Sequence, residues 1–174
     1  MNEPNIGKKA ALKARTEALF VRSWQQEEKG EFRSAFRCLL SAAKLGDTSC
    51  QINLGNYYDA GTVVKRNREA ALYWYKRAIN KGDSTGAQNT GILYRTEGDF
   101  DKALFWLKRA VALGDTEANL WIAKVLIEDK KDPKAAVRHL KLVCKEKPHA
   151  EVSIGGQREA ARLLKKCARL STNN

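Results

Sequence analysis

The chain has 174 residues and a formal net charge of +12, with 43% hydrophobic and 30% charged residues. This length suits one domain with a continuous core, and the composition excludes a disordered chain. Residues 1–20 carry charges every few positions, and no segment has the apolar length of a signal peptide or a membrane span. We therefore expect a cytoplasmic protein that does not span a membrane.

The positive charge is concentrated at the two ends of the chain. Residues 1–15 hold four Lys or Arg and one acidic residue, and residues 130–174 hold twelve Lys or Arg and four acidic residues. The charges between these segments nearly balance. The asymmetry leaves two explanations open, an anionic partner or a solvated basic face that only aids solubility.

Residues 1–15 form a basic extension that we expect to be part of a first helix. From residue 16 onward the sequence repeats itself, with Gly-Asp pairs at 46–47, 82–83 and 114–115. The eighth residue after each Asp is small, and the same pattern can be followed back through the segment before the first pair. These landmarks predict four helix pairs, at residues 16–47, 48–83, 84–115 and 116–147.

The local pattern within each unit fits a pair of helices. In "REAALYWYKRAINKG", residues 68–82, apolar residues recur at three- and four-residue spacing, which predicts an amphipathic helix. Gly82 favours the left-handed conformation that ends a helix, and Asp83 can cap the next helix. The small residues Gly55, Gly91 and Ala123 predict close approach of the two helices. A single pair cannot bury its apolar face alone, so the pairs are expected to stack.

Residues 153–170, "SIGGQREAARLLKKCARL", predict a last helix after a break at Pro148. Its apolar face holds Ala160, Leu163, Leu164, Cys167 and Leu170. Its basic face holds Arg158, Arg162, Lys165, Lys166 and Arg169. Such a helix would cap the open end of the stacked pairs, and residues 171–174 would form a tail.

One segment resembles a known repeat. Residues 54–83, "LGNYYDAGTVVKRNREAALYWYKRAINKGD", are similar to the Sel1-like repeat, a longer-looped relative of the tetratricopeptide repeat, through Leu-Gly, Tyr, a Gly near the turn, Ala, Trp-Tyr, Lys, Ala and Gly. Residues 84–115 keep most of this motif, whereas residues 16–47 and 116–147 are degenerate. The resemblance implies an all-α fold, a right-handed α-α superhelix (solenoid) of about four helix pairs with a C-terminal capping helix. It also implies an adaptor or scaffold.

Few residues suggest chemistry. The four cysteines form no CxxC pair, and we interpret them as reduced, buried, apolar residues: Cys38, Cys50, Cys144 and Cys167. His139 stands at the Trp position of the repeat, and His149 follows Pro148 in a linker. Because no nucleophile has a poised base, we expect no enzyme, metal site or cofactor.

Aromatic residues recur at equivalent positions of two repeats. These residues are Trp74 and Tyr75 in one unit and Phe105 and Trp106 in the next. We interpret all four as core residues and not as a platform for stacking nucleic-acid bases.

A binding surface is expected where the first helices of the pairs line a concave face, by the repeat register and by resemblance to tetratricopeptide grooves. The inward positions would be Phe20, Trp24, Glu27, Ile52, Asn56, Asp59, Gln88, Ile92, Arg95, Leu120, Lys124 and Ile127. Such a mixture of apolar and polar side chains suits a peptide or a helix of a protein partner. The alternative is that the apolar members only pack between helices.

The sequence leaves two functions open. The first is a non-catalytic module that binds another protein, as an adaptor or as a bacterial immunity or chaperone-like protein that neutralises a toxin or enzyme. The second is binding of nucleic acid or another polyanion through the basic C-terminal helix. The basic residues of that helix have no aromatic residues among them, which argues against stacking on bases.

Overall fold

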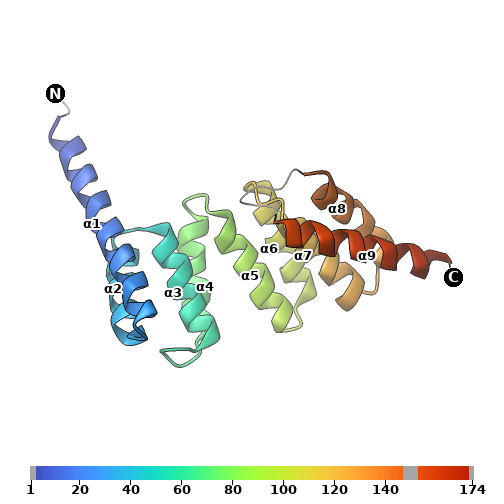
Figure 1. Ribbon diagram of the computed structural model, residues 1–174, viewed down its shortest axis with the longest axis horizontal. Coiled ribbons are helices and arrows are strands. Elements are labelled where there is room, and N and C mark those ends of the chain that lie inside the picture. The colour runs from blue at the N-terminus through green and yellow to red at the C-terminus, as the bar shows by residue number, and fades with distance from the viewer. Residues whose placement is uncertain (1–2, 147–152, 173–174) are drawn as a thin grey trace. The chain divides into compact units, whose positions relative to one another are not determined.

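The computed structural model describes residues 3–146 and 153–172 of the chain, with side chains at 7–146 and 153–170. Within these ranges the chain is all α, and its nine α-helices pack in consecutive pairs (Figure 1). This arrangement confirms the predicted helix pairs followed by one further helix. Pro148 and His149, where a break and a linker were predicted, lie outside the described residues.

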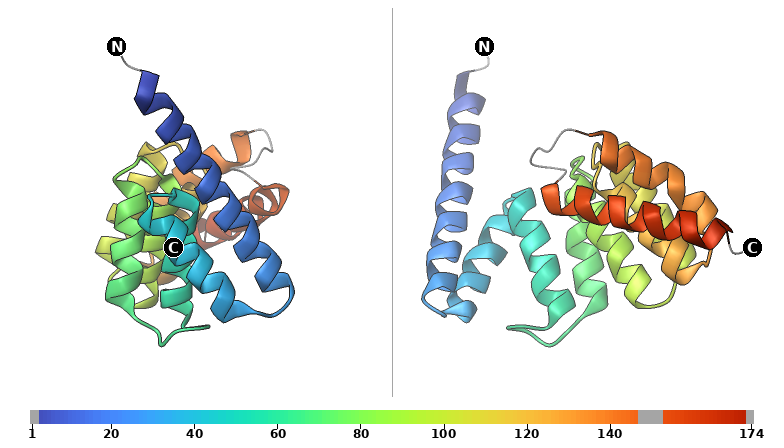
Figure 2. Two further views of the ribbon diagram at one scale, coloured as in Figure 1. Left: turned by 90° about the vertical axis from the view of Figure 1, so that its left-hand side faces the viewer. Right: turned by 45° about the vertical axis from the view of Figure 1, so that its right-hand side comes forward.

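The first two pairs belong to a compact unit that spans Met1–Lys81. Its helices are α1 (Glu3–Glu28), α2 (Phe32–Lys44), α3 (Thr48–Ala60) and α4 (Arg68–Ile79). The core of this unit joins α2, α3 and α4 through Leu39, Ala42, Ala43, Cys50, Leu54 and Trp74. Helix α1 is twice as long as α2, and its first half projects beyond the other helices of the unit (Figure 2).

The remaining helices belong to a second compact unit, Gly82–Asn174. They are α5 (Ser84–Thr96), α6 (Phe100–Ala112), α7 (Ala118–Lys124), which continues into the π-helical turn η1 (Val125–Asp129), α8 (Pro133–Lys145) and α9 (Ile154–Thr172). One core cluster of the unit joins α7, η1, α8 and α9, and Leu120, Leu140 and Leu163 are among its members. Helix α9 therefore caps the α7–α8 pair.

Two glycines set how closely the paired helices approach. A β-carbon at Gly55 of α3 would overlap the ring of Tyr75 on α4. A β-carbon at Gly91 of α5 would lie 2.7 Å from Cγ of Leu107 on α6. Contacts this short are not tolerated, which confirms the predicted role of the small residues in two of the pairs.

Aspartates begin the helices that the Gly-Asp pairs predict. Asp47 accepts a hydrogen bond from the backbone N–H of Cys50, and Asp83 accepts two at the start of α5. Gly82 has a φ of +86°, in the left-handed region that ends a helix. The capping Asp and the left-handed Gly that the sequence predicted therefore mark these helix boundaries in the structure.

Two of the expected core residues are exposed instead. Trp74 and Tyr75 are buried as expected and Trp106 is half-buried, but the side chain of Phe105 is 63% exposed. On α6 the inward face belongs to Ala103, Leu107 and Ala110, so Phe105 lies on the opposite side. Cys144 is also exposed, because Val143 takes the inward position in the last turn of α8.

Candidate functional site

Helix α1 carries two exposed aromatic residues one turn apart. Phe20 is 38% exposed and Trp24 is 58% exposed, and both were predicted to face a partner. Among the α1 side chains that the structure describes, Thr16 and Ser23 are buried, and their hydroxyls donate hydrogen bonds to backbone carbonyls of α1 itself. The helix thus packs through these small residues and Leu19, and it leaves its large aromatic side chains in contact with solvent.

Glu27, the third predicted residue of α1, joins this helix to α3. Its carboxylate accepts a hydrogen bond of 2.5 Å from the hydroxyl of Tyr57. The Tyr57 ring meets Phe36 edge to face, with centroids 5.8 Å apart. Burial raises the pKa of Tyr57, and the hydrogen bond and the negative charge of Glu27 raise it further, so the phenol remains a donor at neutral pH. The carboxylate of Glu27, which lies one helical turn beyond Trp24, is therefore held in a fixed position.

The predicted residues of α3 occupy three different environments. Ile52 is buried, with 7% exposure. Asn56 is exposed and accepts a hydrogen bond of 2.8 Å from the hydroxyl of Tyr75. Asp59 forms an ion pair of 3.3 Å with Arg66 in the following turn. Phe20, Trp24, Glu27 and Asn56 thus remain at the surface of the first unit, and we name the α1 members Phe20, Trp24 and Glu27 the α1 surface.

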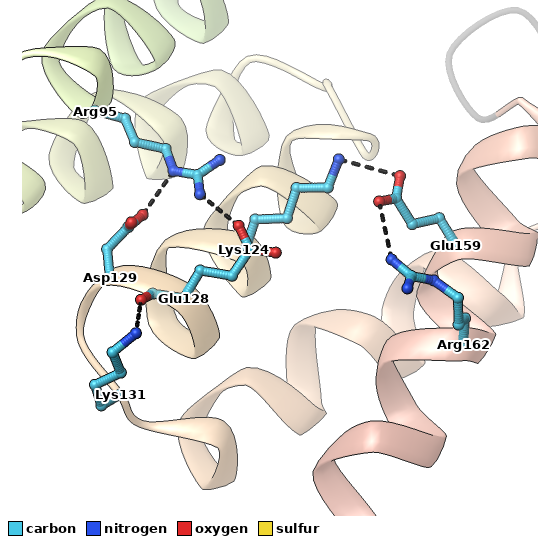
Figure 3. A network of polar contacts seen from close by, with 7 residues as sticks. All are labelled: Arg95, Lys124, Glu128, Asp129, Lys131, Glu159 and Arg162. Atoms are coloured by element: carbon cyan, nitrogen blue, oxygen red, sulfur yellow. Dashed lines mark hydrogen bonds and ion pairs between the residues drawn. The ribbon is translucent and has the colours of Figure 1, made fainter.

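In the second unit, Arg95 binds two carboxylates instead of facing solvent. Its Nε lies 2.6 Å from Oδ2 of Asp129, and its Nη2 lies 2.7 Å from Oε2 of Glu128 (Figure 3). Burial alone would lower the pKa of Arg95, but the hydrogen bonds to Asp129 and Glu128 outweigh it and raise the pKa. The arginine therefore fastens α5 to the π-helical turn.

The predicted residues of α7 and of the π-helical turn are engaged with other helices of the second unit. Leu120 and Ile127 are buried in the core cluster that includes Ala160 and Leu163 of α9. Between them, Lys124 forms an ion pair of 3.1 Å with Glu159 of α9 (Figure 3). Its Nζ also lies 4.5 Å from the ring centroid of Trp121. The face that was expected to hold a partner holds the chain's own last helix.

Gln88 and Ile92, the two other predicted residues of α5, are half-buried.

His139 is buried at the Trp position of the repeat. Its Nδ1 lies 2.9 Å from Oδ1 of Asn119, and its Nε2 accepts a hydrogen bond from Nε of Arg138. Burial, with the charges of Arg138 and Lys108, lowers the pKa of His139 to about 4, so the ring is neutral at pH 7.

The basic face of α9 is exposed along its whole length. Arg158, Arg162, Lys165, Lys166 and Arg169 are placed at its surface, and the last four line a shallow hollow together with Leu170. The side chain of Glu159 is the acidic group of this helix, and it lies beside Lys124 and 3.8 Å from Arg162. The predicted anion-binding residues are therefore brought together on one surface.

The comparison with protein families decides the identity of the repeats. The Sel1 repeat family matches residues 29–47, 48–83 and 87–115. The chain is a Sel1 repeat protein of the tetratricopeptide-repeat-like superfamily. Sel1 repeat proteins are typically protein-interaction modules. Within its described part, this Sel1 repeat protein has no helix both long and apolar enough to cross a membrane, and no group of three or more His, Cys, Asp or Glu placed to hold a metal.

Two solved structures resemble this Sel1 repeat protein. A Sel1 repeat protein from Oxalobacter formigenes is 26% identical over 87% of the chain, with a TM-score of 0.66. A protective antigen present in uropathogenic Escherichia coli strains, displaying an SLR fold, is 27% identical over 78% of the chain, with a TM-score of 0.63. The chain spans 61% of the first protein's length and 31% of the second's. No curated protein matches it.

Sequence reasoning missed the residues that tie this Sel1 repeat protein's predicted surface positions into the fold. Tyr57, Asp129 and Glu159 each bind a residue that was expected to face a partner. Glu159 could have been noticed, because it is an acidic residue on an otherwise basic helix and lies beside the apolar face. Nothing in the sequence indicated that the π-helical turn would bring Asp129 to Arg95.

Proposed function

We propose that this Sel1 repeat protein is a non-catalytic interaction module and binds a partner protein through the α1 surface of its first unit. The observation that carries the proposal is the 58% exposure of Trp24 beside exposed Phe20. Large aromatic side chains are enriched at the centres of protein interfaces, where they supply most of the binding energy. They are less frequent on the rest of a protein's surface.

The choice of the first unit rests on what the side chains of each unit already bind. In the second unit Arg95 and Lys124 are engaged in ion pairs, and Leu120 is buried against other helices of that unit. A partner would have to break these contacts before it could use them. Phe20 and Trp24 require no such rearrangement.

The chemistry of the α1 surface defines the partner that fits it. A helix or extended segment that places an apolar side chain against Trp24 and Phe20 would gain hydrophobic energy. A basic or hydroxyl group of that segment would reach Glu27, which Tyr57 holds in place. Such binding serves an adaptor, and it equally serves a bacterial immunity or chaperone-like protein that blocks a toxin or enzyme.

The proposal is tested by affinity capture from the native organism with three forms of the chain. We expect the wild-type chain to retain a protein that the Trp24→Ala variant does not retain. Tyr73→Ala is the matched control, because Tyr73 is 53% exposed on α4 of the same unit. The purified complex is then measured by calorimetry, where loss of Trp24 should weaken binding by about 2 kcal/mol or more.

Equal retention by all three forms would reject the α1 surface as the binding site. If the retained protein is a toxin or enzyme, assays of its activity with and without the bound chain separate the two roles. Loss of activity identifies a neutralising protein, and retained activity identifies an adaptor. Circular dichroism of each variant checks that the helices remain folded.

A further inference from the structure

The basic face of α9 is a strongly charged surface that the proposed function does not use. It consists of Arg158, Arg162, Lys165, Lys166 and Arg169, which lie at the surface of the second unit. On an α-helix these residues recur at three- and four-residue spacing, so they form one stripe about 16 Å long. The five positions hold no acidic residue, and the neighbouring Glu159 lies at the edge of the stripe, 3.1 Å from Lys124 of α7 and 3.8 Å from Arg162.

We infer that this stripe binds the phosphodiester backbone of double-stranded nucleic acid. Phosphate groups are bound by arrays of Lys and Arg without any apolar contact. Three of the five residues are arginines, whose guanidinium groups can bind a phosphate through two parallel hydrogen bonds.

A protein partner fits the same stripe less well. The centres of protein interfaces contain buried aromatic or aliphatic residues, with charged residues at the rim. Among the residues that line the hollow on α9, Leu170 is the apolar one, and it lies at one end. Aromatic residues are missing from the stripe, so single-stranded nucleic acid would find no stacking platform there.

A lipid surface is also a poor match. Basic amphipathic helices bind membranes by inserting their apolar face between lipids. The apolar face of α9 is already occupied, because Ala160, Leu163 and Cys167 are buried in the core of the second unit. Apart from Ile154 and Leu170 near the two ends of the helix, the exposed side of α9 offers mainly charges to an external ligand, and a charged stripe on a folded domain suits a duplex.

Binding is tested by fluorescence anisotropy with the full chain and a labelled DNA duplex of about 20 base pairs, at about 50 mM and about 200 mM salt. If four residues each neutralise a phosphate, affinity should fall about 100-fold between the two salt concentrations. A variant with Arg162→Gln, Lys165→Gln, Lys166→Gln and Arg169→Gln should lose that dependence and most of the binding at low salt.

A control variant removes the same charge from another exposed helix segment. It carries Lys8→Gln, Lys9→Gln, Lys13→Gln and Arg15→Gln, all in the exposed first half of α1. We expect this variant to bind within a few fold of the wild-type chain. A second variant of the stripe that exchanges Lys and Arg while keeping the charge should also bind, which would show that the charge of the stripe is what the duplex requires. Circular dichroism of the neutralised variant checks that its helices remain folded.

Four outcomes would overturn the inference. The first is that the wild-type chain does not bind the duplex at low salt, and the second is that the stripe variant binds as well as the wild-type chain. The third is that the two four-residue variants weaken binding equally, which would assign binding to net charge alone. The fourth is that polyglutamate or anionic vesicles bind the chain where the DNA duplex and a matched RNA duplex do not.

Discussion

Gly55 lies where the ring of Tyr75 crosses α3, and any side chain there would overlap that ring. We expect Gly55→Ala to lower the free energy of unfolding by about 2 kcal/mol, since an overpacked core must shift its side chains or backbone. Urea denaturation followed by circular dichroism measures the change. Gly7→Ala is the control, because a methyl group added at Gly7 would meet no atom within 4 Å and Ala favours helix. Equal effects of the two substitutions would contradict the close approach.

Because His139 is buried, the stability of the protein should decrease in acid. Burial, together with the charges of Arg138 and Lys108, lowers the pKa of His139 from 6.5 to about 4. The unfolded chain therefore binds a proton between these two values that the folded chain does not bind. The contribution of neutral His139 to the free energy of unfolding should be complete above pH 6.5. The free energy of unfolding should then fall by up to ~3 kcal/mol as the pH decreases toward 4.

Denaturation of the wild-type chain and of His139→Gln at a series of pH values isolates this contribution. The variant should lose less stability in acid, because Gln does not titrate and can still donate to Asn119. His149 is present in both chains and cancels in the comparison. Parallel curves for the two chains would show that His139 does not resist protonation in the folded state.

At the level of single residues, the sequence correctly predicted the helix caps and turns, which depend on local backbone geometry. Asp83 and Gly82 act as expected, because capping and left-handed turns are local properties. The burial of aromatic residues was predicted less well. Trp74 and Phe105 occur in similar phrases, but Phe105 aligns with exposed Tyr73 and not with Trp74. A shift of one position on a helix turns a side chain by about 100°, which moves it from the core to the surface.

At the scale of elements, the ion pairs of Arg95 on α5 hold the π-helical turn η1 in place. The side chains of Arg95 and Asp129 are each 19% exposed, so removal of one leaves a poorly solvated charge. We expect Arg95→Met to lower the free energy of unfolding by about 2 kcal/mol. Asp129→Asn in the Arg95→Met background should cost much less than in the wild-type chain.

Urea denaturation of the four chains in this double-mutant cycle measures the coupling. Arg95→Lys provides a further comparison, because an ammonium group cannot reach both carboxylates through the fixed fork of a guanidinium. We expect only partial recovery of stability with Lys. Additive effects of the Arg95 and Asp129 substitutions would show that the ion pair does not hold the turn.

The packing of the elements explains why several of the predicted surface residues are engaged within the fold. The sequence indicated that the last helix would cover apolar surface, and it does. It did not indicate which surface, because Leu120 of α7 and Ile127 of η1 have the same spacing as groove residues of an uncovered repeat. Tertiary packing of α9 decided between the two roles, and such packing is not encoded in the repeat register.

At the scale of the whole molecule, the chain consists of two compact units, and each has its own helix-pairing glycine. In repeat proteins each element is stabilised mainly by its neighbours, so a local defect opens the neighbouring helices more than distant ones. We expect Gly55→Ala to speed amide hydrogen exchange most in α3 and α4. Gly91→Ala, which places a methyl group against Leu107, should do so most in α5 and α6.

Hydrogen exchange measured by mass spectrometry distinguishes this behaviour from cooperative unfolding of the whole chain. Peptides from α8 and α9 serve as the internal reference, since they lie in the second unit but outside the α5–α6 pair. If either substitution accelerates exchange uniformly from α2 to α9, the chain unfolds as one cooperative body. A response confined to the altered pair means that the α1 surface and the basic stripe of α9 can be perturbed one at a time.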